Sequence, residues 1–343
     1  MSDSTPFDVV QEMAHNDRRA YLEQRLFVYS PINTLWTAVA IFVLLFGAYV
    51  VAAYFSGAPL LVPHGIGNGV RFALLFSLLI ATVLGIQRFA RVYERADFAA
   101  HAAILSGGVE DAKRATALTP DSARLSRATI IGVVLGAILC WTVIPVSPPL
   151  QTWPTYVWFC AVTVLISTLF ARGVSLTRSA ARGMRELIDG HLVVDLLRID
   201  RLSVIGRAAA RGALVWFVIS AVVCLFFIGG RVDSFTVALL FGCAAMGVWI
   251  FVATMETVRR KIRAAKAVEL EHVRREIDVA RAAPGETLQG LLAYEARIMA
   301  VHEWPFDQTT LMRVGASALI LAVPWFGQAA AAFVVERFAD IPK

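Results

Sequence analysis

Charged residues are scarce in this chain. Only 17% of its 343 residues are Asp, Glu, Lys or Arg, whereas a soluble domain carries about a quarter. Hydrophobic residues make up 58% of the sequence. This composition places the chain among membrane proteins. The net charge of +6 does not indicate a nucleic-acid partner, because the Lys and Arg residues lie between apolar runs, as membrane topology requires.

Motifs of catalysis, metal binding and redox chemistry are also missing. The sequence holds no P-loop, GxGxxG, GxSxG or HExxH pattern, and its six histidines are scattered. The four cysteines lie inside apolar runs without CxxC spacing and are typical of small buried hydrophobic residues. His191 with Asp189 and Asp195 comes nearest to a catalytic cluster. We therefore expect no enzyme activity, cofactor or metal, and no small-molecule substrate can be identified.

The N-terminal segment, residues 1–32, lacks the basic stretch and apolar core of a cleavable signal peptide. The first apolar run then serves as an uncleaved insertion signal. Apolar residues in this segment are spaced for one helical face, which later shifts: Phe7, Val10, Met13, Ala14, then Tyr21, Leu22, Leu26 and Phe27. The pattern predicts an amphipathic helix that lies on the membrane surface or on the protein's own cytoplasmic part.

Long apolar runs dominate the rest of the chain. Six of them predict transmembrane helices, at residues 35–55, 71–88, 128–146, 155–171, 212–230 and 234–255. The second run is short, with charges at both ends, so its outer end borrows residues 65–70, or the helix tilts very little, or the bilayer thins locally. Short links join the runs in pairs. The fold expected is therefore an all-α polytopic membrane protein with six transmembrane helices in three hairpins, and with helical cytoplasmic extensions.

The distribution of Lys and Arg predicts the topology. Of the 32 such residues, 28 lie in the N-terminal segment or in the segments 88–127, 172–211 and 257–313, and only Arg71 and Arg231 lie in the short links. The positive-inside rule places the N-terminus and the long segments in the cytoplasm. The expected location is the bacterial inner membrane, with the lipid bilayer as the first partner.

A seventh apolar run, Val314–Val335, is long enough to cross and carries a kink signal at Pro324 and Gly327. Three arginines start membrane segments in a similar way, each preceded by an aspartate that can cap a helix: Arg127, Arg207 and Arg313. Their side chains are expected at the inner interface. This similarity favours a kinked seventh span at Val314–Val335 within the segment 308–343, which also includes the C-terminal tail, and a re-entrant hairpin remains the alternative.

The segment 257–307 predicts a cytoplasmic helical hairpin that follows the membrane domain of residues 33–256. Apolar spacing continues from Val258 but slips by one residue between Ala265 and Leu270, which argues against a long coiled coil. Antiparallel packing of residues 270–280 against Leu288, Leu291, Leu292, Ile298 and Met299 is favoured, and oligomerisation through a coiled coil is the alternative. The motif Trp304, Pro305, Phe306 and Asp307 is either a coupling elbow or an interface anchor with a helix cap.

The cores of the apolar runs contain no Asp, Glu, Lys, Arg or His, which argues against a proton-coupled carrier. Hydroxyl groups and small residues remain, including Gly132 and Gly136 in a GxxxG pattern that is typical of close helix packing. We therefore expect a non-enzymatic scaffold or signalling subunit that binds itself or a partner through residues 257–307. The alternative is an oligomeric channel or transport component with a pore lined by small and hydroxyl residues.

Overall fold

Long helices make up most of the molecule. The computed structural model describes residues 33–57, 60–62, 65–117, 122–142, 153–227, 234–281 and 286–301. Within these ranges six helices are long and apolar enough to cross a membrane, which confirms the prediction of an all-α polytopic membrane protein. They are α3 (Thr34–Phe55), α4 (Asn68–Ala96), α7 (Ser122–Thr142), α8 (Trp153–His191), α9 (Ser203–Cys224) and α10 (Ser234–Ala280).

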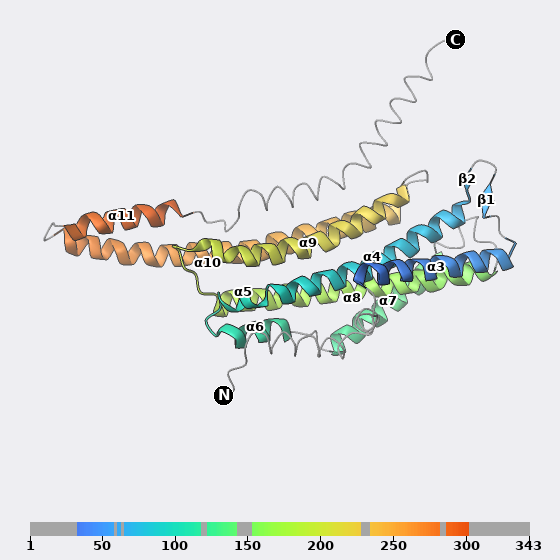
Figure 1. The fold of residues 1–343 in the computed structure, drawn as a ribbon, viewed down its shortest axis with the longest axis horizontal. Helices are drawn as coiled ribbons and strands as arrows, with labels where there is room; N and C mark the ends of the chain where they lie inside the picture. Colours follow the sequence, from blue (N-terminus) through green and yellow to red (C-terminus); the bar gives the residue numbers. More distant parts are fainter. Residues whose placement is uncertain are drawn as a thin grey trace, which may run out of the picture.

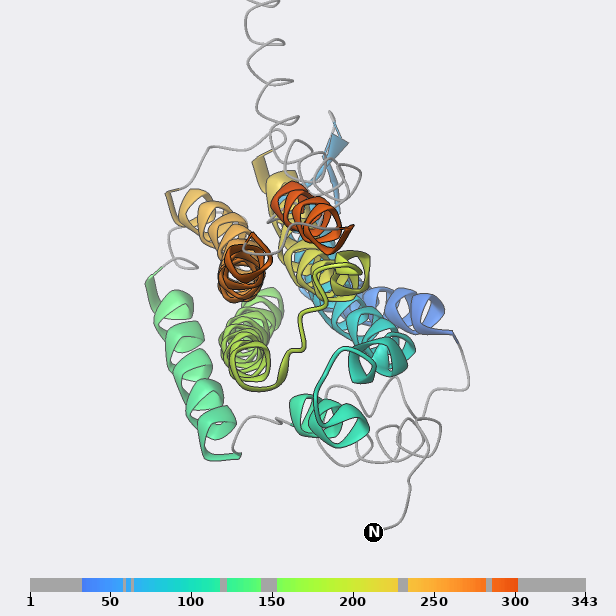
Figure 2. The same cartoon turned by 90° about the vertical axis from the view of Figure 1, so that its left-hand side faces the viewer.

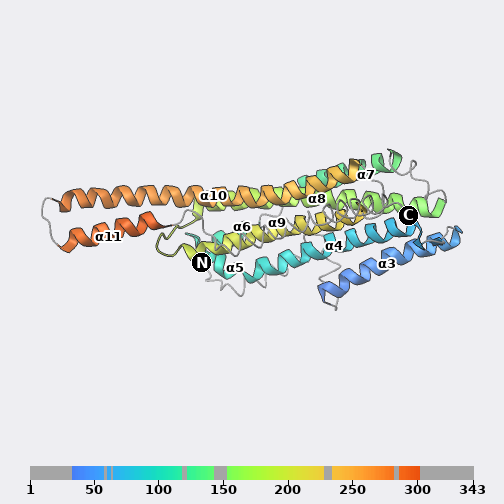
Figure 3. The ribbon, with the colours of Figure 1, turned by 90° about the horizontal axis from the view of Figure 1, so that it is seen from above.

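Shorter elements lie at the two ends of this bundle (Figure 1). One end carries β1 (Leu61–Val62) and β2 (Gly65–Ile66), an antiparallel pair in which Leu61 faces Ile66. The other end carries α5 (Phe98–Ala102), α6 (Gly108–Ala117), the 3-10 turn η3 (Ile199–Leu202) and α11 (Glu286–Ala300). A second 3-10 turn, η4 (Leu225–Phe227), follows α9. We call α11 and the part of α10 from Glu256 onward the stalk, because together they project beyond the bundle (Figure 3).

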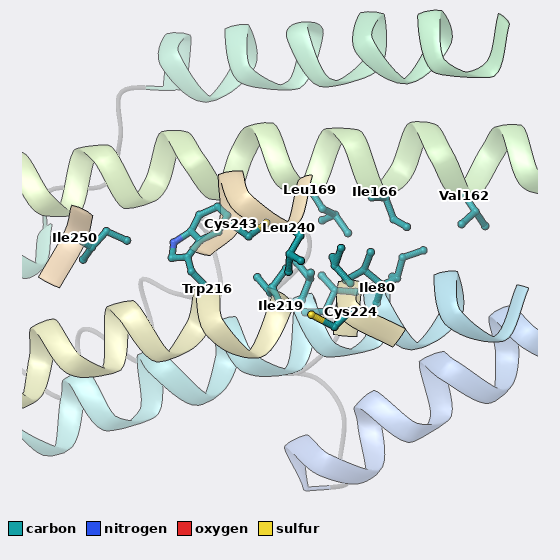
Figure 4. Packing of buried hydrophobic residues seen from close by; sticks show 14 residues of the cluster. Ile80, Val162, Ile166, Leu169, Trp216, Ile219, Cys224, Leu240, Cys243 and Ile250 are labelled. Carbon is teal, nitrogen blue, oxygen red and sulfur yellow. The ribbon is translucent and has the colours of Figure 1, made fainter. Parts of the chain in front are cut away.

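Sequence neighbours pair in space as α3 with α4, α7 with α8 and α9 with α10, so the three predicted hairpins are confirmed. Helices α4, α8, α9 and α10 meet in one apolar core, against which α3 packs (Figure 4). This core includes Ile80, Ile166, Trp216, Ile219 and Leu240. Helix association in a bilayer depends on such packing, because lipid tails are as apolar as the side chains themselves.

Helix α7 approaches α8 unusually closely at the GxxxG pattern. A methyl group on Gly132 would lie 2.5 Å from the Thr168 Cα, and one on Gly136 would lie 2.6 Å from the Val164 Cα. Two small residues one turn apart thus allow the backbones to meet. The GxxxG pattern therefore packs α7 against α8 within the chain. This is the close helix packing that the sequence predicts.

The ends of two spans differ from their predicted bounds. Helix α4 starts at Asn68, so Arg71 lies in its first turn, where its guanidinium donates to the Phe226 carbonyl at 3.3 Å. The fifth span was expected at residues 212–230, but α9 runs from Ser203 to Cys224. It starts earlier because Ile205, Ala209 and Ala213 are buried against neighbouring helices and continue the apolar face of the span.

Candidate functional site

The end of the bundle that carries the stalk has an apolar core of its own. We call this part the junction layer: α5, α6, the last turns of α8, residues 192–211 and residues 257–262 of α10. Its buried side chains include Phe98, Leu105, Ile188, Ile205 and Ile262. Each comes from a different segment, so the layer joins all three hairpins. Figure 2 looks along the bundle from this end and shows α5 and α6 beside the long helices.

A short backbone bridge holds two loops of this layer together. Leu105 and Leu192 form an isolated antiparallel bridge. The Ser106 amide donates to the His191 carbonyl at 2.8 Å, and the Val193 amide donates to the Ile104 carbonyl at 3.1 Å. The loop after α5 is thereby fixed to the end of α8.

A contact between a carboxylate and a histidine lies beside this bridge. The Asp111 carboxylate, which is almost fully buried, contacts the His191 Nδ1 at 2.8 Å and accepts a hydrogen bond from the Gly107 amide at 2.8 Å. Gly108, with φ of 55°, makes the left-handed turn that starts α6 and brings Asp111 back toward the loop. The interaction thus ties α6 to α8.

His191, Asp189 and Asp195, which come nearest to a catalytic cluster in the sequence, have separate partners in the structure. His191 pairs with Asp111, which the sequence had not singled out. The Asp189 carbonyl accepts a hydrogen bond from Lys261, and the Asp195 carboxylate accepts one from the Leu197 amide at 3.0 Å. The Asp195 carboxylate thus stabilises the turn that follows α8, and the backbone of Asp189 contacts α10.

An ion pair joins the corner between α4 and α5 to α9. Arg211 lies 2.6 Å from the Asp97 carboxylate, and both side chains are mostly buried. The same guanidinium lies over the Tyr93 ring, 6.0 Å from its centre. Arg211 is thus stabilised at the base of α9 by a carboxylate and an aromatic face.

The stalk is an antiparallel pair of helices. Val273 and Ile277 of α10 and Ile298 of α11 are buried, with Leu288 and Leu291 packed against them. Two predicted contact residues, Leu292 and Met299, are instead about half exposed. They lie about 100° around α11 from Leu291 and Ile298, so they cannot share the buried stripe fully.

The slip in apolar spacing along α10 marks a change of partner. Val258 and Ile262, before the slip, are buried in the junction layer. Val273 and Ile277, after it, are buried against α11. The helix itself continues without a break from Ser234 to Ala280. The new register rotates the buried stripe to the side where α11 lies.

Polar contacts fasten α11 to α10 along its length. Arg274 binds Glu295 at 2.9 Å, and the Tyr294 hydroxyl donates to the Glu269 carboxylate at 2.9 Å. Near the end of α11, the Lys266 ammonium donates to the carbonyls of Met299 and Val301 at 2.8 and 3.1 Å. A cation at this place satisfies carbonyls that have no partner within the helix.

The hydrogen bond to Glu269 raises the pKa of Tyr294 above its ordinary value, because it favours the neutral phenol. The stabilisation that this hydrogen bond gives to the stalk is therefore present below pH 10, and it is lost as the pH rises through the raised pKa of Tyr294. We expect Tyr294→Phe to remove about 0.5 kcal/mol from stalk pairing and to abolish this alkaline loss. Spin labels at Val279 and Gln289 would report the helix separation between pH 8 and 12. Glu271→Gln, an exposed control on α10, should leave the alkaline change intact, and a change that survives Tyr294→Phe would assign it to another group.

The predicted site residues are only partly within the described ranges. Arg127 and Arg207 are exposed near the starts of α7 and α9, and Arg207 donates to the Ser203 hydroxyl at 3.3 Å. Helix α9 starts after Leu202 without a side-chain cap, so the aspartate cap expected before Arg207 is not formed. The remaining residues lie outside the described ranges, and so does the predicted seventh span: Trp304, Pro305, Phe306, Asp307, Arg313, Pro324 and Gly327.

The polar groups of the described helices mainly support structure. The hydroxyls of Thr129, Thr142, Thr168 and Ser220 each donate to the carbonyl four residues earlier in the same helix. In the described part of the chain, no three His, Cys, Asp or Glu side chains lie close enough together to hold a metal ion.

Comparison with known proteins identifies no relative. No protein-family model matches the chain, and no significant similarity to a curated protein or to a solved structure was found.

Proposed function

We propose that this protein is a non-enzymatic scaffold or signalling subunit of the bacterial inner membrane that binds a partner protein through its stalk. The N-terminus and the stalk then lie in the cytoplasm, as the excess of Lys and Arg in these segments favours. The observation that carries the proposal is the continuity of α10. This helix of 47 residues, about 70 Å long at 1.5 Å per residue, is both a membrane span and one half of the stalk.

The junction layer supports this role because it braces the base of the stalk. Val258 and Ile262 are fully buried there, and Lys261 donates to the Asp189 carbonyl at the end of α8. A displacement of the stalk would therefore have to disturb α8 and the loops fixed to it. Such a rigid connection suits a protein that positions a partner at the membrane or transmits its binding to the bundle.

The stalk also presents apolar side chains that its own packing leaves open. Val268 and Val279 are 69% and 76% exposed. They are eleven residues apart, three helical turns, and so lie on one face of α10. Neither contributes to the apolar cluster between α10 and α11. Exposed apolar residues that recur along one face are typical of helix-mediated binding.

The channel alternative gains less support. The core shared by α4, α8, α9 and α10 is filled with apolar side chains. Four hydroxyls that a pore would need are bonded to their own helices. A pore would then have to form between copies of the chain. Solute or ion flux through the purified protein in liposomes would support that alternative.

A photoreactive amino acid at Val279 of the full-length membrane protein tests the proposal. We expect one dominant adduct in cells, whose mass distinguishes a second copy from another protein. A second substitution, Val268→Asp, should suppress the adduct without altering thermal unfolding, whereas Glu271→Gln on a neighbouring exposed position should not. The same photoreactive group at Ile131, on the exposed apolar face of α7, controls for nonspecific capture. An adduct that is insensitive to Val268→Asp would contradict a specific stalk interface.

A further inference from the structure

The last turns of α4 expose an apolar stripe that is not covered by the described helices. Phe89 and Val92 are 45% exposed, as is Tyr93 at the edge of the stripe, and Ala96 is exposed one turn further on. The uncharged run of α4 ends at Arg88, and Arg91, Glu94 and Arg95 follow it, so the later residues lie beyond the span that the sequence predicts. Apolar side chains that recur along a helix outside the bilayer favour a covering partner.

This stripe continues the surface of α4 that α3 covers. A methyl group on Gly85 would lie 3.3 Å from the Ala38 Cβ, which fixes the contact between the two helices. At 100° per residue, Phe89, Val92 and Ala96 all lie within about 40° of Gly85 around α4. The same face is thus buried along the span and open after it.

The start of α3 explains where the cover ends. Helices α3 and α4 are antiparallel neighbours (Figure 3). Thr34, the first residue of α3, precedes Ala38 by one turn and therefore lies level with Phe89. Residues before Thr34 consequently join the described fold beside the open stripe.

The sequence of this preceding segment fits the stripe. Leu22, Leu26 and Tyr29 follow a spacing of four and three, which places them on one face of a helix. Ala20 and Gln24 fall on the opposite face, and Phe27 lies on that side of the helix as well. Only residues 30–33 separate Tyr29 from α3, so this apolar face is tethered within reach of Val92. The short tether gives it a high effective concentration there.

We propose that the apolar face of residues 22–29 docks on the Phe89–Val92–Ala96 stripe of α4. The N-terminal segment would then bind the protein's own surface, and it would extend the contact of α3 with α4 beyond the bilayer. Its docking also places it beside Tyr93, whose ring contacts Arg211 and hence the Asp97 ion pair. The segment becomes part of the junction between the bundle and the stalk.

Thiol labelling of the full-length protein tests this docking. Val92→Cys is introduced with the four native cysteines replaced by alanine, and it is labelled with a water-soluble maleimide. We expect labelling about tenfold slower than at a matched exposed site, Val193→Cys, because reaction requires local opening. Leu22→Asp with Leu26→Asp should restore fast labelling. Ala20→Asp with Gln24→Asp, at the same spacing on the opposite face, should leave the protection intact.

Two further measurements separate docking on α4 from binding to lipid. Protection of Val92→Cys should be equal in detergent and in nanodiscs of neutral or anionic phospholipid, and a Leu26→Cys, Val92→Cys pair should form a disulfide on mild oxidation. Protection that appears only in anionic nanodiscs would assign the segment to the membrane surface and overturn the proposal. Labelling of Val92→Cys that is as fast as that of Val193→Cys would overturn it as well.

Discussion

Replacing Gly132 with alanine is expected to separate α7 from α8 and to destabilise the bundle by about 2 kcal/mol, as overpacking of a close contact does. The new methyl group would meet the Thr168 Cα at 2.5 Å and the Ser167 carbonyl oxygen at 2.9 Å. Both are backbone atoms, so no side-chain rotation can relieve the contact. Gly136→Ala should act in the same way on Val164, and the two changes together should lower the melting temperature in detergent further than either alone.

Gly242→Ala provides the matched control. Gly242 also lies within a membrane-spanning helix, but a methyl group there would meet nothing within 4 Å. Replacing glycine with alanine should raise helix propensity equally at both positions. The difference in melting temperature between the two variants therefore reports the α7–α8 contact alone. A second readout is the reactivity of Cys140, which is buried and donates to the Cys160 carbonyl across the same helix pair. Equal melting temperatures for Gly132→Ala and Gly242→Ala would contradict the close packing.

The helices and their pairing were predictable because their signals are local. Apolar runs define the spans, and short polar links force neighbouring spans into hairpins. The contact of Gly132 and Gly136 with α8 also follows from a short motif. The bounds of α9 were less predictable, because Ala209 and Ala213 are small residues whose burial depends on the helices around them.

The side-chain contacts of Asp111 and Asp97 in the junction layer left no such signal in the sequence. Asp111 and His191 lie in different segments between the spans, as do Asp97 and Arg211. No periodicity connects residues so far apart, and each side chain taken alone is typical of a solvated loop. The slip in apolar spacing on α10 did carry information. In the sequence it indicates only a weak coiled-coil pattern, whereas in the structure α10 changes partner there, from the junction layer to α11.

The junction layer should depend strongly on Asp111. This carboxylate accepts the Gly107 amide and pairs with His191 while almost fully buried. Asp111→Ala leaves a donor at Gly107 without its acceptor and removes the charge that faces His191. We expect a local loss of about 2–3 kcal/mol, because unmade hydrogen bonds of charged, buried groups are costly. Hydrogen exchange at the Ser106 and Val193 amides, which close the backbone bridge beside Asp111, would measure this loss.

Graded substitutions separate the two interactions of Asp111. Asp111→Asn keeps an acceptor for the Gly107 amide but removes the charge. About half of the protection from hydrogen exchange at the Ser106 and Val193 amides should therefore remain. Glu110→Ala is the matched control, since Glu110 is an exposed acid in the same helical turn and should change the exchange by less than about 0.5 kcal/mol. If the amides exchange alike in Asp111→Ala and Glu110→Ala, the loop after α5 is held by the backbone bridge and the apolar contacts of Leu105 and Leu192, without a contribution from Asp111. If they differ as expected, a single buried carboxylate couples α6 to the end of α8, next to the carbonyl that binds Lys261 at the base of the stalk.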